Sequence, residues 1–119
     1  MLLLIEYPGC STCQKARRWL EGQGAAFESR NIKEQAPTAA ELERWQAQSG
    51  LALKRFFNTS GLLYKSMQLK DKLPAMPQAE QIALLASDGM LVKRPLLIGD
   101  GFVLAGFKEA EWRAALGVK

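Results

Sequence analysis

Two cysteines, Cys10 and Cys13, stand near the start of the chain, where an apolar segment gives way to an amphipathic one. The apolar run Leu2–Glu6 is typical of a buried strand, and Tyr7-Pro8-Gly9 breaks it. The next four residues, Ser11-Thr12-Cys13-Gln14, have the Ser-x-x-Gln pattern of a capping box, which predicts that a helix begins with Ser11 as its capping residue. We therefore expect a Cys-x-x-Cys pair at the turn between a strand and a helix.

The rest of the chain has a strand and a helix, then a helical middle, and then strands again. An opening strand–helix–strand unit favours parallel pairing of the first two strands. Asp100-Gly101 between two short apolar runs is typical of a hairpin, which adds antiparallel strands. We thus predict an α/β fold with a mixed four-stranded sheet and helices packed around it. Further strands are expected at 26–32, 96–98 and 102–104, and helices at 11–24, 38–50, 77–88 and 109–116, with a mostly helical stretch at 51–73 broken at 58–61.

A few side chains in these segments are predicted to form the centre of the core. They lie on the first and third expected strands along the chain and on the first expected helix. A large-to-small substitution among them is expected to destabilise the fold. The residues expected to be buried are Leu3, Leu4, Ile5, Leu20, Leu97 and Ile98.

Size and composition narrow the class of protein. The chain has 119 residues, 48% of them hydrophobic and 24% charged, which fits one globular domain. No apolar run approaches the ~18 residues of a membrane span, and the apolar start lacks the basic segment of a secretion signal. The net charge of +4 is spread along the chain, which argues against direct nucleic-acid binding. We expect a cytoplasmic protein that binds neither membrane nor nucleic acid.

The sequence contains no histidine and only two cysteines. The commonest general base and the commonest zinc ligand are therefore both absent, and we expect no bound metal or cofactor. A nucleophile in this chain has to be activated by a helix end, by Lys or Arg, or by desolvation.

Cys10 is the better placed of the two thiols to act as a nucleophile. The unpaired N–H groups and the dipole at a helix start favour a thiolate there and lower its pKa. Cys13 lies nearly one turn further along on the same side, so it could resolve a mixed disulfide formed at Cys10. The other interpretation, two ordinary buried thiols or an inert disulfide, stays open at this point.

Four segments taken together resemble the arsenate reductase (ArsC)/Spx/MgsR family. The resemblance covers nearly the whole chain, in order and at family-like spacing. It implies a thioredoxin- or glutaredoxin-like core with an inserted helical subdomain, here a single domain 1–119 with its core at about 1–34 and 90–119 and the insertion at about 35–89. The segments are YPGCSTCQKAR at 7–17, RNI at 30–32, FNTSG at 57–61 and RPLLI at 94–98.

The resemblance also implies roles for individual residues. It places a cis proline, Pro95, beside the redox cysteine, and gives Arg94 the task of binding an oxyanion or stabilising the thiolate of Cys10. The expected catalytic residues are thus Cys10, Cys13 and Arg94. We expect Ser11, Thr12 and Pro95 to contact the substrate or donor thiol.

Two departures from the arsenate reductase pattern affect the expected activity. Arsenate reductases of the glutaredoxin-dependent branch usually have no cysteine at position 13, and they use two further arginines. Asn58 and the Gly106-Phe107 region take the places of those arginines here. We therefore expect weak or absent arsenate reduction and a readily formed Cys10–Cys13 disulfide.

Three functions follow from the resemblance. The first is a thiol-dependent reductase acting on a small thiol, disulfide or oxyanion, with glutathione or a redox protein such as thioredoxin or glutaredoxin as electron donor. The second is a redox-sensing regulator of the Spx/MgsR type that binds the RNA polymerase alpha subunit through a Cys-x-x-Cys switch. The third is a thioredoxin-fold domain without turnover.

Overall fold

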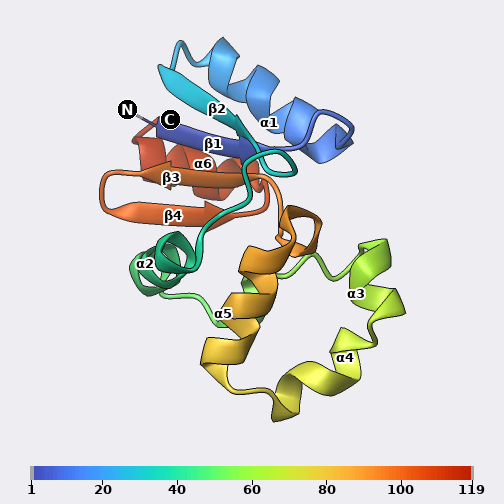
Figure 1. Ribbon diagram of the computed structural model, residues 1–119. Coiled ribbons are helices and arrows are strands. Elements are labelled where there is room, and N and C mark those ends of the chain that lie inside the picture. The colour runs from blue at the N-terminus through green and yellow to red at the C-terminus, as the bar shows by residue number, and fades with distance from the viewer. Residues whose placement is uncertain (1, 119) are drawn as a thin grey trace.

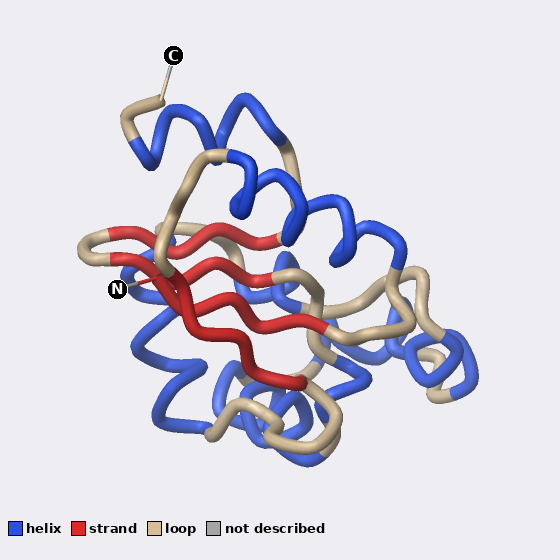
Figure 2. The backbone as a smooth tube through the Cα atoms, turned by 90° about the horizontal axis from the view of Figure 1, so that it is seen from above, coloured by secondary structure: helices blue, strands red, loops and turns tan. Residues whose placement is uncertain are grey.

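The computed structural model describes residues 2–118, and its four strands form one mixed sheet in the order β2-β1-β3-β4 (Figures 1 and 2). β1 pairs in parallel with β2, while β1 with β3 and β3 with β4 are antiparallel. This arrangement confirms the predicted mixed four-stranded sheet. The strands are β1 (Leu2–Glu6), β2 (Phe27–Asn31), β3 (Leu96–Gly99) and β4 (Phe102–Ala105).

Helices cover both faces of the sheet (Figure 2). On one face lie α1 (Ser11–Gly22) and α6 (Glu109–Leu116), and on the other lies the helical middle of the chain. This middle is built from several helical pieces, and one break falls at Gln68, which adopts the left-handed conformation with φ 55°. Its elements are α2 (Ala39–Ser49), η1 (Leu53–Phe56), α3 (Leu62–Ser66), α4 (Leu69–Lys72), η2 (Leu73–Ala75), α5 (Gln78–Ser87) and η3 (Gly89–Leu91).

Side-chain alternation along β1 and β3 divides the core between the two faces. Leu4 is opposite Leu97 and packs with α1 and α6, while Ile5 is opposite Leu96 and packs with the helical middle. This is the period of two that a strand imposes. A set of expected core residues is fully buried, namely Leu4, Ile5, Leu20 and Leu97.

The expected burial of Leu3 and Ile98 is wrong in degree. The two residues face each other across β1 and β3, and both are only partly buried against the cluster beneath the helical middle. The helical layer thus covers this end of the sheet incompletely. Sequence hydrophobicity alone does not distinguish a covered strand position from one at the margin of a layer.

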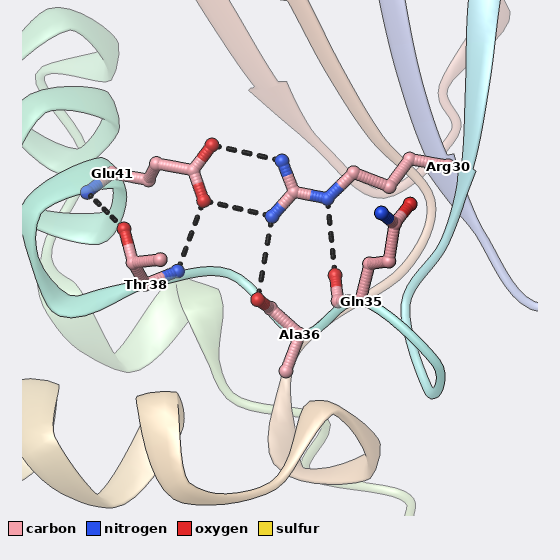
Figure 3. Close-up of polar contacts among 5 residues, drawn as sticks. All are labelled: Arg30, Gln35, Ala36, Thr38 and Glu41. Carbon is pink, nitrogen blue, oxygen red and sulfur yellow. Dashed lines mark hydrogen bonds and ion pairs between the residues drawn. The ribbon is translucent and has the colours of Figure 1, made fainter.

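An ion pair connects β2 to α2 (Figure 3). The guanidinium of Arg30 binds both carboxylate oxygens of Glu41, at 2.7 and 2.8 Å, and also donates to the carbonyl oxygens of Gln35 and Ala36. Glu41 is also the third residue of α2, and it forms a capping box with Thr38. One carboxylate therefore caps a helix and anchors it to the sheet.

A second connection joins the helical middle to the segment before β3. Phe57 forms an antiparallel bridge with Val92, flanked by backbone hydrogen bonds from Asn58 N–H to Leu91 and from Lys93 N–H to the carbonyl of Phe56, each 2.8 Å long. This short ladder brings η1 next to the chain that leads into Arg94.

In residues 2–118, no helix has the length and apolar character needed to cross a membrane.

Candidate active site

Cys10 itself caps α1. Its backbone is extended, with φ −93° and ψ 118°, and its Sγ accepts a hydrogen bond from the N–H of Cys13 at 3.3 Å. Ser11 is already the first helical residue, so the expected capping box headed by Ser11 is wrong. The reason is that the sulfur of Cys10 accepts this hydrogen bond, and the helix therefore begins one residue earlier than a Ser11 cap would give. The side chain of Gln14 donates instead to the carbonyl of Pro8, at 2.9 Å.

The loop before α1 is held at both ends. The N–H of Cys10 donates to the carbonyl of Tyr7 at 3.0 Å, and the Gln14 amide holds the carbonyl of Pro8. These bonds turn the chain from β1 into α1 and leave Cys10 half-buried, with its sulfur at the helix start. The geometry expected from strand, turn and helix signals is therefore present in the structure.

The pKa of the Cys10 thiol is lowered. Partial burial alone would raise it, but hydrogen bonds from Cys13, the positive charge of Arg94 and the backbone N–H of Thr12 outweigh that effect. These contributions all favour the thiolate, which is the nucleophilic form of cysteine.

The pKa of Cys13 moves in the opposite direction. Burial is the main cause, and the hydrogen bond and negative charge of Cys10 add to it, so the pKa of Cys13 is raised to about 12. Both cysteines are free thiols. The pair thus contains one thiol poised to ionise and one held in the protonated form.

Arg94 lies beside the pair and precedes the buried Pro95, to which it is joined by a cis peptide bond, as expected. Its guanidinium carbon lies 5.3 Å from the centre of the Tyr7 ring, and its Nη1 is 3.5 Å from the carbonyl oxygen of Met90. Its Nε is buried and has no hydrogen-bond partner within residues 2–118. Tyr7 was expected only to break a strand. No signal in the sequence indicated that its ring would support the arginine.

Two pockets share Arg94 as a wall. The first, which we name the apolar pocket, has a volume of about 530 Å³. The second, which we name the basic pocket, has a volume of about 340 Å³ and includes Thr12 from the Cys-x-x-Cys segment. The apolar pocket is also lined by Asn58, Leu62 and Leu63. The basic pocket is also lined by Arg55, Lys93, Phe107 and Lys108.

The structure therefore brings Thr12 and Arg94 together, with Arg94 acting electrostatically on both cysteines. Asn58 lines the apolar pocket and Phe107 lines the basic pocket, so each of them shares a pocket with Arg94. Sequence reasoning alone does not place Arg55 in this region, where the structure puts it in the wall of the basic pocket. Within residues 2–118, no three Cys, Asp or Glu side chains form a group that could hold a metal ion.

The family model of the ArsC family matches residues 5–115, which is nearly the whole chain. The chain belongs to the ArsC family. This membership, with the observed sheet order, confirms the predicted fold of thioredoxin and glutaredoxin type with a helical insertion.

Two relatives share about half of their residues with this ArsC-family chain. The "Uncharacterized protein YusI" of Bacillus subtilis (strain 168) is 50% identical over 106 residues, covering 89% of this chain and 90% of YusI. A crystal structure of a putative ArsC family related protein from Bacteroides fragilis is 51% identical, covers 95% of each chain and superposes with a TM-score of 0.93.

A regulator is also homologous to this ArsC-family chain. The "Global transcriptional regulator Spx" of Enterococcus faecalis (strain ATCC 700802 / V583) is 27% identical over 116 residues, which is 98% of this chain and 86% of Spx. The relatives of this chain therefore include a protein named for transcriptional control as well as one named only for the ArsC family.

Proposed function

We propose that this ArsC-family protein is a cytoplasmic thiol-disulfide oxidoreductase in which Cys10 is the nucleophile and Cys13 the resolving thiol. The observation that carries the proposal is the opposite displacement of the two pKa values within one hydrogen-bonded pair. Shifted pKa values of this kind, with a charged residue beside the group, are typical of functional sites rather than of inert buried thiols.

The chemistry proceeds in two exchanges. The Cys10 thiolate attacks one sulfur of a substrate disulfide, forms a mixed disulfide and releases the first thiolate. Cys10 then carries no negative charge, so one cause of the raised pKa of Cys13 is removed. Cys13 loses its proton, attacks Cys10 and releases the second thiolate, and the protein is left with a Cys10–Cys13 disulfide. Glutathione, or a thioredoxin or glutaredoxin, then reduces it.

The test is a turnover assay with small disulfides, using glutathione or thioredoxin as reductant. We expect Cys10→Ser to abolish turnover. Cys13→Ser should accumulate a mixed disulfide at Cys10 that intact-mass measurement detects. The proposal fails if no disulfide oxidises the wild-type pair, or if Cys10→Ser retains activity.

Arsenate is expected to be a poor substrate. An arsenate ester at Cys10 carries negative charge, and each missing charged donor costs ~1.5–3 kcal/mol on the scale of charge-assisted hydrogen bonds. Asn58 and Phe107 cannot supply that charge, whereas Arg55 and Lys93 lie in the basic pocket and supply part of it. Robust arsenate turnover that is abolished by Cys10→Ser but kept by Cys13→Ser would contradict this expectation.

A redox-sensing regulator is the second candidate, and the homology with Spx favours it. In this role, the oxidation state of Cys10 and Cys13 would control binding to the RNA polymerase alpha subunit. Titration calorimetry of the reduced and oxidised protein with purified alpha subunit tests it. Binding that differs between the two states would favour the regulator, and no binding in either state would exclude it.

A further inference from the structure

The basic pocket carries an uncompensated positive charge. Four of its eight lining residues are cationic, and none of those eight is acidic. The cations come from three parts of the chain: η1, the segment before β3, and the start of α6. They are Arg55, Lys93, Arg94 and Lys108.

These cations are not consumed by ion pairs within the protein. In the described residues, neither Arg55 nor Lys93 has a carboxylate within 4.0 Å, and Lys108 has only a contact of 4.0 Å with the exposed Glu111. Elsewhere the chain pairs its arginines closely, as with Arg17 on Glu6 and Arg30 on Glu41. Cations gathered around a concave surface without counter-charges create a potential that attracts anions.

The fold fixes one of these cations in place. Lys93 N–H donates to the carbonyl of Phe56 at 2.8 Å, so the ladder that joins η1 to this segment positions its backbone. Its side chain passes over Gly106: a Cβ built at that glycine would lie 3.1 Å from Cε and 3.9 Å from Nζ of Lys93. Lys93 is accordingly half-buried, and its ammonium group lies against the wall of the basic pocket.

The basic pocket borders the proposed redox centre, although neither cysteine lines it. Thr12 lies between the two cysteines, and Arg94 lowers the pKa of Cys10, so two wall residues also belong to the immediate surroundings of the nucleophile. The volume of about 340 Å³ lies within the range of ~300–1,000 Å³ of small-molecule sites. A ligand anchored among these cations would thus keep its sulfur close to Cys10.

We infer that the disulfide reduced at Cys10 carries a carboxylate or phosphate group, and that this group binds in the basic pocket against Arg55 and Lys93. The inference rests on the proposed function. In the reaction, the acidic disulfide RSSR and the Cys10–Cys13 dithiol yield two RSH and the Cys10–Cys13 disulfide. The two protons of the dithiol end on the released thiols, so no further oxidant or reductant is needed.

Single-turnover oxidation of the pre-reduced protein tests the inference. Dithiodipropionate supplies a dianionic disulfide, hydroxyethyl disulfide a neutral one and cystamine a cationic one, and quenched samples are analysed by mass for the Cys10–Cys13 disulfide. Each rate is divided by the rate of the same disulfide with free dithiothreitol, which removes differences in leaving-group chemistry. Glutathione disulfide and coenzyme A disulfide then distinguish carboxylate from phosphate as the bound group.

We expect normalised rates in the order dianionic, neutral, cationic, with the first about tenfold above the second at low salt and a smaller difference at high salt. Arg55→Gln and Lys93→Gln should each lower the ratio of dianionic to neutral rates. Arg44→Gln, which changes an exposed arginine of α2, should leave that ratio unchanged.

The outcomes separate the inference from the proposed function. Equal normalised rates for all three disulfides would overturn the inference while leaving the oxidoreductase intact. A preference that Arg55→Gln and Lys93→Gln do not alter would also overturn it. If no disulfide oxidises the pair, both the proposed function and the inference fail.

Discussion

The backbone N–H of Cys13 donates a hydrogen bond to the Sγ of Cys10 across 3.3 Å, so each cysteine of the motif directly affects the other. The bond favours the thiolate of Cys10, and that thiolate in turn disfavours ionisation of Cys13. The two thiols are therefore inequivalent before any substrate arrives, and their order of reaction follows from the geometry of one helix start.

Alkylation across pH should distinguish the two thiols. Because the pKa of Cys10 is lowered, a larger fraction of it is thiolate at a given pH, and iodoacetamide should modify it with an apparent pKa below that of an ordinary cysteine. Cys13 is buried and its pKa is about 12, so it should stay unmodified until strongly alkaline pH. Peptide mapping by mass spectrometry measures both rates. Labelling of Cys13 first near neutral pH would reverse the assigned roles.

Cys13→Ala provides an internal control for that experiment. The substitution keeps the backbone N–H that bonds to Cys10 but removes the side-chain thiol, whose hydrogen bond also lowers the pKa of Cys10. The apparent pKa of Cys10 in the same alkylation assay should therefore rise in this variant.

Removing the positive charge of Arg94 should slow the reaction of Cys10 at mildly acidic pH. Its guanidinium favours the thiolate, so Arg94→Met raises the pKa of Cys10 and leaves less thiolate at pH 6. Arg94→Lys keeps a charge without the planar stacking on Tyr7, and should fall between wild type and Arg94→Met. Arg18→Met removes an exposed charge from α1 and serves as the matched control. Equal alkylation rates in all four proteins would contradict this prediction.

The Arg30–Glu41 pair should make stability depend on pH in the acidic range. Hydrogen bonds from Arg30 lower the pKa of Glu41 from 4.5 to about 2. A carboxylate whose pKa is lowered by folding stabilises the folded state above the unfolded pKa, and this stabilisation disappears as pH falls through the folded value. We expect Glu41→Gln to lower the free energy of unfolding by about 2 kcal/mol at pH 7, on the scale of hydrogen bonds to charged groups.

The difference between wild type and Glu41→Gln should therefore shrink between pH 4.5 and pH 2. Urea unfolding followed by tryptophan fluorescence measures it. Glu43→Gln changes an exposed acid of the same helix and should have little effect at either pH. A constant difference across this range would show that the pair does not contribute through its charge.

Leu97→Ala should be among the more damaging core substitutions. Leu97 is fully buried between β1, β4 and the layer of α1 and α6, so its truncation removes buried apolar surface and leaves a cavity. We expect a loss of about 2–5 kcal/mol in the free energy of unfolding. Leu62→Ala changes a leucine that is 87% exposed and should cost less than about 0.5 kcal/mol. A similar cost for both would contradict the burial of β3.

Local signals predicted the element order well because the interactions that set it are local. Apolar runs located β1, β3 and β4, and Asp100-Gly101 marked the hairpin, whereas the signal for β2, whose sequence is FESRN, was weak. The first helix shows the limit of such signals. Ser11 and Gln14 have the letters of a capping box, but the competing acceptor, the sulfur of Cys10, is one residue earlier and takes the cap.

The sequence by itself determined the order of strands and helices along the chain, the place of the Cys-x-x-Cys pair at a helix start, and the family resemblance. Each of these depends on short segments whose residues are close along the chain. Only the tertiary structure decided which charges surround the pair. Tyr7 supports Arg94, and Arg55 reaches the same pocket as Lys93 because the Phe57–Val92 bridge joins segments that are far apart in sequence. Electrostatic attraction depends on distance in space, and hydrophobic periodicity carries no information about which distant cations the folded chain brings together.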